Sequence, residues 1–213
     1  MKLTPAASFL LLSTFPSTMA YSSAPYPGEI CLTGNVNEIN NWCASNNCCQ
    51  GQSACGLWNV DATVTICEDS CNGNYPCEEW YGKGEYIVHS GSCNGLQACT
   101  SLGRNIVEGA SISVGRGSCN GNEAMCYSIA EQSKSPELVV NIDDNTCIGL
   151  RACQFAGKDS KVLKSLTVNA DSCHGDRSCF EIDRTTTDLE FLQIYQIDDD
   201  APITVSNFLI IGC

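Results

Sequence analysis

Apolar and polar side chains alternate in five short segments of the chain, which recur at intervals of 22 to 28 residues. In each segment the apolar positions lie two residues apart, and most of them are β-branched or aromatic. This spacing predicts a β-strand with one buried face and one outward face. The predicted inward pairs are Val64 and Ile66, Tyr86 and Val88, Ile112 and Val114, Val140 and Ile142, and Leu166 and Val168.

Each predicted strand leads into the same cysteine unit, and one further copy of this unit precedes the first strand. The unit reads Cys-x-Gly-x-x-x-Cys, with one extra residue in the fourth copy, and Ser or Thr precedes five of the six copies. Asn-Gly in three copies predicts a tight turn directly after the strand. The six cysteine pairs are Cys49 and Cys55, Cys71 and Cys77, Cys93 and Cys99, Cys119 and Cys126, Cys147 and Cys153, and Cys173 and Cys179.

A unit that recurs at this period is typical of a solenoid, in which each repeat forms one coil and stacks on its neighbours. The predicted fold class is therefore all-β, a parallel β-helix of about six to seven coils that disulfides staple. Residues 21–48 are expected to form an N-terminal cap, and residues 49–186 the β-helix repeats. Residues 187–213 are expected to form the last coil and a C-terminal cap.

Residues 1–20 have the features of a signal peptide. A positive charge at Lys2 is followed by an apolar stretch, and a small residue, Ala20, marks the expected cleavage site. All 17 cysteines follow that site, so they are expected to enter an oxidising compartment and to pair. The predicted location is extracellular, with the cell wall as one form of it.

The sequence leaves two pairings of the repeat cysteines open. We favour pairing within each unit, which closes a short loop where the glycine lets the chain bend. Pairing between adjacent coils is the alternative, because equivalent cysteines are also neighbours there. The odd total of 17 leaves one cysteine as a free thiol or as a disulfide link to another chain. Two histidines and no Cys-x-x-Cys sequence argue against a zinc site or a thioredoxin-like site.

The unit from Ser92 to Cys99, Ser-Cys-Asn-Gly-x-x-Ala-Cys, resembles that of a group of cysteine-rich secreted repeat proteins of diatoms and related algae. The resemblance covers residues 49–180. It implies a right-handed parallel β-helix and secretion, and it brings no catalytic residues to this chain. In an algal setting, Ala20-Tyr21 is also similar to a plastid-targeting junction, but the acidic, cysteine-rich sequence downstream favours secretion.

A net charge of −13 narrows the expected partners. Nucleic acid and anionic membrane surfaces both attract Lys and Arg, so we expect neither as a partner. No later segment is apolar for long enough to predict a membrane-spanning helix. A polysaccharide, the extracellular matrix or a cell-wall surface is the expected partner.

Many parallel β-helices act on polysaccharides, so an enzyme is one alternative. Its site would need clustered carboxylates, as general acid and base or as ligands to calcium. The candidate acids are Asp143, Asp144, Asp171, Asp176 and Asp198 to Asp200. Aligning the repeats places Asn145 and Asp171 in one column with Asp69, the one pattern that suggests calcium. Apart from this column, no cofactor or metal is expected.

Neither histidine is interpreted as catalytic. His174 precedes Gly175 at the position that Asn holds in other units, so His174-Gly175-Asp176-Arg177 is interpreted as a substituted turn. His89 follows a predicted strand on its outward side, and we expect it at the surface. No catalytic residue is therefore predicted.

The outward strand positions form the candidate binding face. Small polar side chains dominate it, and stacked coils would arrange them in two columns that suit a carbohydrate chain, a mineral or ice. The candidate residues are Thr63, Thr65, Ser111, Ser113, Asn141, Ser165 and Thr167. The leading hypothesis is a non-enzymatic structural or adhesive protein. The alternatives are a polysaccharide lyase or hydrolase and a carbohydrate-, mineral- or ice-surface binder.

Overall fold

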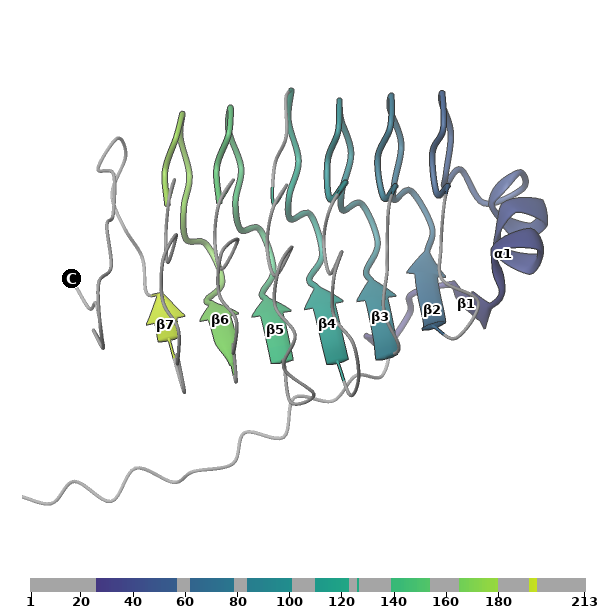
Figure 1. Ribbon diagram of the computed structural model, residues 1–213, viewed down its shortest axis with the longest axis horizontal. Coiled ribbons are helices and arrows are strands. Elements are labelled where there is room, and N and C mark those ends of the chain that lie inside the picture. The colour runs from purple at the N-terminus through teal and green to yellow at the C-terminus, as the bar shows by residue number, and fades with distance from the viewer. Residues whose placement is uncertain are drawn as a thin grey trace, which may run out of the picture.

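The computed structural model describes residues 26–56, 62–78, 84–100, 110–122, 126, 139–153, 165–179 and 192–194. Within these ranges the chain forms seven strands and one helix, so the described structure is predominantly β (Figure 1). The elements are β1 (Cys31–Gly34), α1 (Val36–Cys43), β2 (Ala62–Cys67), β3 (Gly84–Val88), β4 (Ala110–Val114), β5 (Val139–Ile142), β6 (Leu166–Val168) and β7 (Leu192–Ile194). The predicted signal peptide and most of the predicted C-terminal cap lie outside the described residues.

All seven strands belong to one sheet, in which their spatial order equals their order in the sequence. β1 is antiparallel to β2, and every later pair is parallel. The register places equivalent positions of successive segments opposite one another, such as Val64 beside Tyr86 and Tyr86 beside Ile112. The five predicted strands are therefore confirmed as β2 to β6.

The inward residues of these strands form the core of the protein. The inward side chains that the structure describes are at most 1 % exposed: Val64, Ile66, Tyr86, Val88, Ile112, Val114, Val140, Ile142 and Val168. They belong to one buried cluster together with the cysteines of the six units. Strand alternation thus separates the two faces as predicted, because successive side chains of a strand point to opposite sides.

A narrow loop follows each of β2 to β6, and neighbouring loops lie side by side (Figure 1). Backbone hydrogen bonds join them. The N–H of Cys93 donates to the carbonyl of Ser118 at 2.9 Å, and the N–H of Gly95 donates to the carbonyl of Asn72 at 2.7 Å. The backbone groups of one loop are therefore satisfied by the loops on both sides, as buried polar groups require.

The glycine of each unit lets the loops approach closely. Gly95 has a φ of +137°, and a Cβ atom built on it would lie 1.7 Å from the carbonyl oxygen of Gly121. Gly73 meets the carbonyl of Gly95 in the same way, at 2.3 Å. Any side chain here would both strain the backbone and separate two loops, which explains why the glycine recurs in all six units.

Helix α1 packs next to β1 at the N-terminal end of the sheet (Figure 1). It begins with a capping box, in which Asn35 accepts hydrogen bonds from the first turn and Glu38 accepts one from the N–H of Asn35. Its residues Ile39 and Cys43 are buried in the same cluster as the inward strand residues. The helix therefore continues the core beyond the first strand.

Candidate functional site

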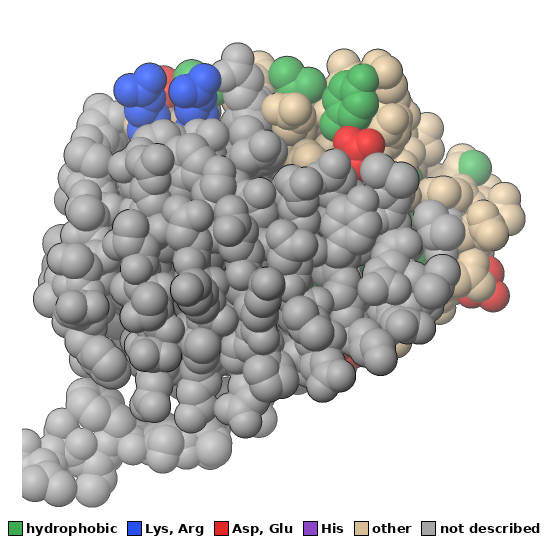
Figure 2. Space-filling model, in the orientation of Figure 1, with side chains coloured by type: hydrophobic (Ala, Val, Ile, Leu, Met, Phe, Trp, Pro, Cys, Tyr) green, Lys and Arg blue, Asp and Glu red, His purple; other side chains and the backbone are tan. Residues whose placement is uncertain are grey.

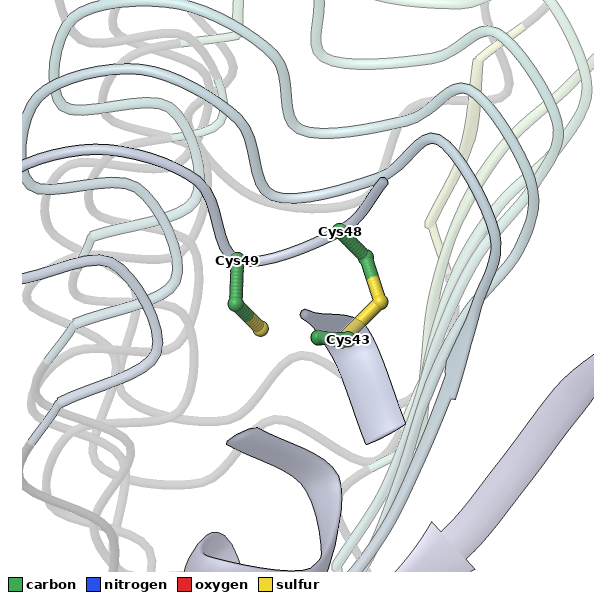
Figure 3. A group of neighbouring side chains, drawn as sticks. All are labelled: Cys43, Cys48 and Cys49. Atoms are coloured by element: carbon green, nitrogen blue, oxygen red, sulfur yellow. A yellow bond between two sulfur atoms is a disulfide. The ribbon is translucent and has the colours of Figure 1, made fainter. Parts of the chain in front are cut away.

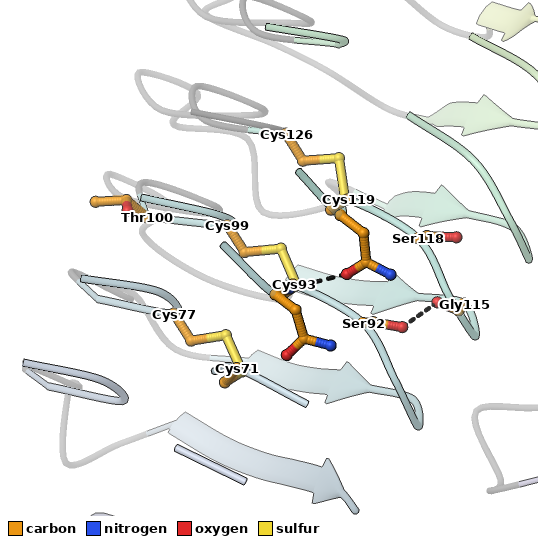
Figure 4. Close-up of a disulfide and its surroundings, with 12 residues drawn as sticks. Cys71, Cys77, Ser92, Cys93, Cys99, Thr100, Gly115, Ser118, Cys119 and Cys126 are labelled. Atoms are coloured by element: carbon orange, nitrogen blue, oxygen red, sulfur yellow. Dashed lines mark hydrogen bonds between the residues drawn. A yellow bond between two sulfur atoms is a disulfide. The ribbon is translucent and has the colours of Figure 1, made fainter. Parts of the chain in front are cut away.

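The six cysteine units each close on themselves. All six predicted disulfides within the units are present: Cys49–Cys55, Cys71–Cys77, Cys93–Cys99, Cys119–Cys126, Cys147–Cys153 and Cys173–Cys179. Figure 4 shows the disulfides Cys71–Cys77, Cys93–Cys99 and Cys119–Cys126, each closing its own loop and stacked beside the next. All of these cysteines except Cys49 are fully buried. The disulfides thus form part of the core, with no thiolate left at these positions for catalysis or metal binding.

Two more disulfides fasten the N-terminal region, namely Cys31–Cys67 between β1 and β2, and Cys43–Cys48 after α1. Together the eight disulfides use 16 cysteines, which leaves only Cys213 of the 17 in the sequence. Cys213 lies outside the described residues. It is the odd cysteine that the sequence count predicts.

Several cysteines lie close enough together to suggest a metal site. Cys43, Cys48 and Cys49 are one such group, and Figure 3 shows the bond between Cys43 and Cys48 with Cys49 beside it. Cys49 is bonded to Cys55. Since metals bind the thiolate form of cysteine, these sulfur atoms are poor ligands while the disulfides are intact.

The column that suggested calcium has a conformational explanation. The residue two positions before the first cysteine of each unit has a positive φ, between 52° and 71°. Asn, Asp and Gly tolerate this conformation best, and they fill all six positions: Asn47, Asp69, Gly91, Gly117, Asn145 and Asp171. The backbone therefore accounts for the Asx residues of this column without a bound cation.

The residue after the first cysteine forms a ladder between units. The N–H of Asn72 donates to Oδ1 of Asn94 at 2.9 Å, and Nδ2 of Asn94 donates to the carbonyl of Asp69 at 2.9 Å. His174 holds the same position, and its Nε2 lies 2.5 Å from the carbonyl of Asn145. Asn145 stands two residues before its cysteine, as Asp69 does. His174 therefore repeats the contact that the asparagine side chains make.

The Ser or Thr that precedes the first cysteine in five of the six units has a structural role that the sequence pattern does not indicate. These side chains are fully buried, and each hydroxyl donates to a backbone carbonyl. Ser92 Oγ donates to the carbonyl of Gly115 at 2.5 Å, as Figure 4 shows, and Ser118 Oγ donates to that of Asp143 at 2.5 Å. The hydroxyls of Ser92, Ser118 and Thr146 thus link adjacent repeats inside the core, whereas those of Ser70 and Ser172 bond within their own repeat.

Several of the candidate catalytic acids form hydrogen bonds within the protein or occupy positions that its backbone conformation explains. Asp144 accepts two hydrogen bonds from the Arg116 guanidinium, with Nη2 at 2.8 Å, and one from the Arg116 backbone N–H. Asp176 accepts a hydrogen bond from the backbone N–H of Leu150 at 3.2 Å. Asp171 occupies the positive-φ column, and Asp198 to Asp200 lie outside the described residues. The structure thus gives Asp144, Asp171 and Asp176 roles in the fold.

The residues of the candidate binding face differ in their exposure to solvent. Thr63 is exposed, and Ser111, Ser113, Asn141 and Ser165 are partly exposed. In contrast, Thr65 and Thr167 are each only 5 % exposed, and the outward Ile87 of β3 is 2 % exposed. Thr65 also shares a hydrogen bond with Thr33 of β1 across the register, with 2.6 Å between their Oγ1 atoms. A continuous flat ligand cannot contact all seven residues in this arrangement.

An N-terminal strap, residues 26–30, buries His89. We expected His89 at the surface, and this expectation is wrong, because its residue exposure is 3 %. His89 Nδ1 lies 2.7 Å from Oε2 of Glu29, whose Oε1 accepts a hydrogen bond from the Ser90 N–H at 3.1 Å. The Tyr26 and His89 rings pack edge to face, with their centres 4.7 Å apart. The strap is thus fixed by a buried polar contact and by ring packing.

The strap also reaches the next two repeats. The Arg116 guanidinium lies 4.2 Å from the centre of the Tyr26 ring, and the same guanidinium is bonded to Asp144. Burial and the Asp144 carboxylate raise the pKa of Tyr26 to about 12. Glu29 and His89 also lie close to Cys67, but Cys67 is bonded to Cys31 and offers no thiolate. We therefore interpret this group as a fastening of the strap.

No family model, curated protein or solved structure matches this chain. In the part of the chain that the structure describes, no helix has the length and apolar character needed to cross a membrane. The function must therefore be inferred from the geometry of the chain itself.

The turn role of His174 can be tested by substitution. We expect His174→Asn to leave the free energy of unfolding unchanged within about 0.5 kcal/mol, because asparagine makes the same contact in other units. We expect His174→Ala to lower it by about 1 kcal/mol, the usual worth of one hydrogen bond. Denaturant unfolding of both variants measures the difference. Equal losses in the two variants would contradict the assigned role.

The hydrogen bonds of Glu29 in the strap predict that the free energy of unfolding decreases in acid. Burial by itself raises the pKa of Glu29, but hydrogen bonds from His89, Ser90 and Tyr26 outweigh it and hold the pKa below its usual value. Ionised Glu29 therefore stabilises the folded chain above the unfolded pKa of about 4.3, and this contribution disappears as the pH falls through the lower folded pKa. We expect the wild-type chain to be more stable than Glu29→Gln at neutral pH, by an amount that shrinks below about pH 4. Denaturant unfolding across this pH range is the measurement, and a difference independent of pH would refute the assignment.

Proposed function

We propose that the chain is a secreted structural or adhesive protein without enzymatic activity, built as a right-handed parallel β-helix. Parallel strands in sequence order, with repeat-equivalent residues in register, support a solenoid of stacked coils. The handedness rests on the resemblance to the algal repeat proteins and on the general preference of parallel crossovers.

One observation carries the functional proposal: the recurring polar side chains of the units bond to neighbouring units. The Asn ladder, the buried hydroxyls and the Asx column all make contacts within the stack or meet its backbone requirements. A disulfide closes the loop of each unit, so every one of these loops is constrained covalently, while hydrogen bonds join one unit to the next. Such a rod suits a load-bearing or surface-coating role better than a site for turnover.

The location proposed for the mature chain is extracellular, including the cell wall. The eight disulfides and the signal-peptide pattern of residues 1–20 support it, and a plastid location is the weaker alternative. A polysaccharide or matrix surface is the proposed partner. Cys213 offers a further attachment, through a disulfide to another chain, because every other cysteine is paired within this one.

The structure supports the two alternative functions, a surface binder and a polysaccharide-active enzyme, to different degrees. A surface binder agrees with the exposed Thr63 and the partly exposed Ser111, Ser113, Asn141 and Ser165, although the buried Thr65 and Thr167 interrupt that face. A polysaccharide lyase or hydrolase requires a pair of acids that act on substrate. Asp144 and Asp176, two of the candidates, are instead engaged in hydrogen bonds.

Incubation with a panel of algal and plant polysaccharides tests the proposal. We expect the purified chain to sediment with insoluble wall polysaccharide and to release neither reducing ends nor unsaturated sugars. The same chain with its disulfides reduced is the control for binding by the folded rod. Robust cleavage that Asp144→Asn or Asp171→Asn abolishes would replace this proposal with the enzyme alternative.

A further inference from the structure

The strap brings four potential metal ligands together at the end of β2. Glu29, Cys67 and His89 have ligand atoms that all lie within 4.8 Å of one another. Cys67 Sγ lies 3.8 Å from Glu29 Oε2, and His89 Nδ1 lies 2.7 Å from the same oxygen. Cys31 joins the group because its sulfur is bonded to that of Cys67. Two sulfurs, one imidazole nitrogen and one carboxylate oxygen thus lie together.

This donor set matches the preferences of zinc, which binds cysteine, histidine and carboxylate ligands in a tetrahedron. Zinc bonds of about 2.3 Å to sulfur and about 2.0 Å to nitrogen or oxygen place tetrahedral ligand atoms about 3.3 to 3.8 Å apart. Separating the two sulfurs is therefore the main movement that a zinc ion requires. The sequence argues against zinc because it has no Cys-x-x-Cys and only two histidines. The fold instead draws the ligands from three segments that are far apart in the chain.

The surroundings of the cluster are those of a buried metal site. The His89 and Glu29 side chains are only 4 % and 6 % exposed, and Cys67 is fully buried. Backbone N–H groups orient the Glu29 carboxylate, from Tyr26 at 3.0 Å and from Ser90 at 3.1 Å, as outer contacts orient metal ligands. The Ser90 hydroxyl is buried too, and among the described contacts it has no hydrogen-bond partner. The oxidised chain thus leaves a polar atom beside His89 unused.

The Cys31–Cys67 disulfide controls the cluster, because zinc binds the thiolate form of cysteine. Cys31 is partly exposed, whereas both cysteines of each unit from Cys71–Cys77 to Cys173–Cys179 are fully buried. A dithiol reductant can therefore reach Cys31. Its first thiolate bonds to the Cys31 sulfur and releases Cys67 as a thiolate, and its second thiolate then displaces Cys31 from that mixed disulfide. The reductant becomes a disulfide, and its two electrons leave both cysteines reduced.

We propose that opening this disulfide creates a zinc site, whose ligands are Cys31, Cys67, His89 and Glu29. The two thiols lose their protons to solvent as zinc binds, so the ion is held by two thiolates, a neutral imidazole and a carboxylate. Zinc then joins the strap, β1 and the end of β2, which the disulfide and the Glu29–His89 contact join in the oxidised chain. The disulfide fastens these segments in an oxidising compartment, and zinc fastens them in a reducing one.

Cobalt(II) is the probe for this site, because it occupies tetrahedral zinc sites and gives a charge-transfer absorption band when a thiolate binds it. Exposed carboxylates, some of which Figure 2 shows in red, also bind divalent cations, so the readout is this band and not the total bound cobalt. We expect no band from the oxidised chain and one thiolate-bound cobalt per chain after mild reduction with dithiothreitol. Alkylation and peptide mass spectrometry verify that Cys31 and Cys67 are the reduced pair, and zinc is expected to displace the cobalt.

A variant opens the site without any reductant. Cys31→Ser frees the Cys67 thiol in the otherwise oxidised chain, and we expect it to bind cobalt through the three remaining ligands. Adding His89→Asn is expected to weaken this binding at least about tenfold, and adding His174→Asn, the matched control at the other histidine, less than about twofold. Thermal unfolding of each variant verifies that the fold is retained.

Four outcomes would overturn the inference. They are the absence of the band when Cys31 and Cys67 are both reduced, an equal loss of binding in the His89→Asn and His174→Asn variants, an undiminished band in the reduced Cys31→Ser/Cys67→Ser double variant, and reduction of a unit disulfide before Cys31–Cys67. The third outcome would assign the metal to other cysteines. All four concern metal binding alone, so they leave the proposed function, which binding and cleavage of wall polysaccharide test, unaffected.

Discussion

The close approach of neighbouring loops at the glycine of each unit is the constraint on which the described structure depends. A Cβ atom on Gly95 would lie 1.7 Å from a backbone oxygen of the next loop, so the two loops can approach this closely only because Gly95 has no side chain. In the observed register the Asn ladder and the buried hydroxyls meet their partners. Inward residues of successive strands then meet in rows, such as Val64, Tyr86 and Ile112.

The disulfides offset a backbone cost that this stacking creates. Both cysteines of every unit have a positive φ, between 50° and 57°, in a region that costs roughly 1–2 kcal/mol for a residue with a side chain. Closing a loop as short as that from Cys93 to Cys99 contributes roughly 2–2.5 kcal/mol by restricting the unfolded chain. The two effects are of similar size. Net stability therefore comes from apolar burial and from the hydrogen bonds between units.

Much of this arrangement could be predicted from the sequence, because it depends on local patterns. Period-two apolar residues identified the inward face, and the short spacing within each unit favoured partners such as Cys93 and Cys99 over pairing between adjacent coils. The burial of His89 could not be predicted, since Glu29 covers it from 60 residues away in a segment without periodicity. The reason for the Asx column was equally hidden, because it lies in the φ angles of residues such as Asp69.

The cysteine units contain positions that keep one residue type and positions that vary. The recurring Asn and Gly positions contact neighbouring units, whereas the residue two positions before the second cysteine varies from Tyr75 through Gln97 to Arg177 without any change of backbone conformation.

The pairing of the cysteines tests the central claim, that each unit closes on itself, most directly. Proteolysis of the unreduced chain followed by mass spectrometry identifies every linked peptide. The account predicts the six links within units, together with Cys31–Cys67 and Cys43–Cys48. A link between cysteines of adjacent units, such as Cys77 to Cys93, would contradict it.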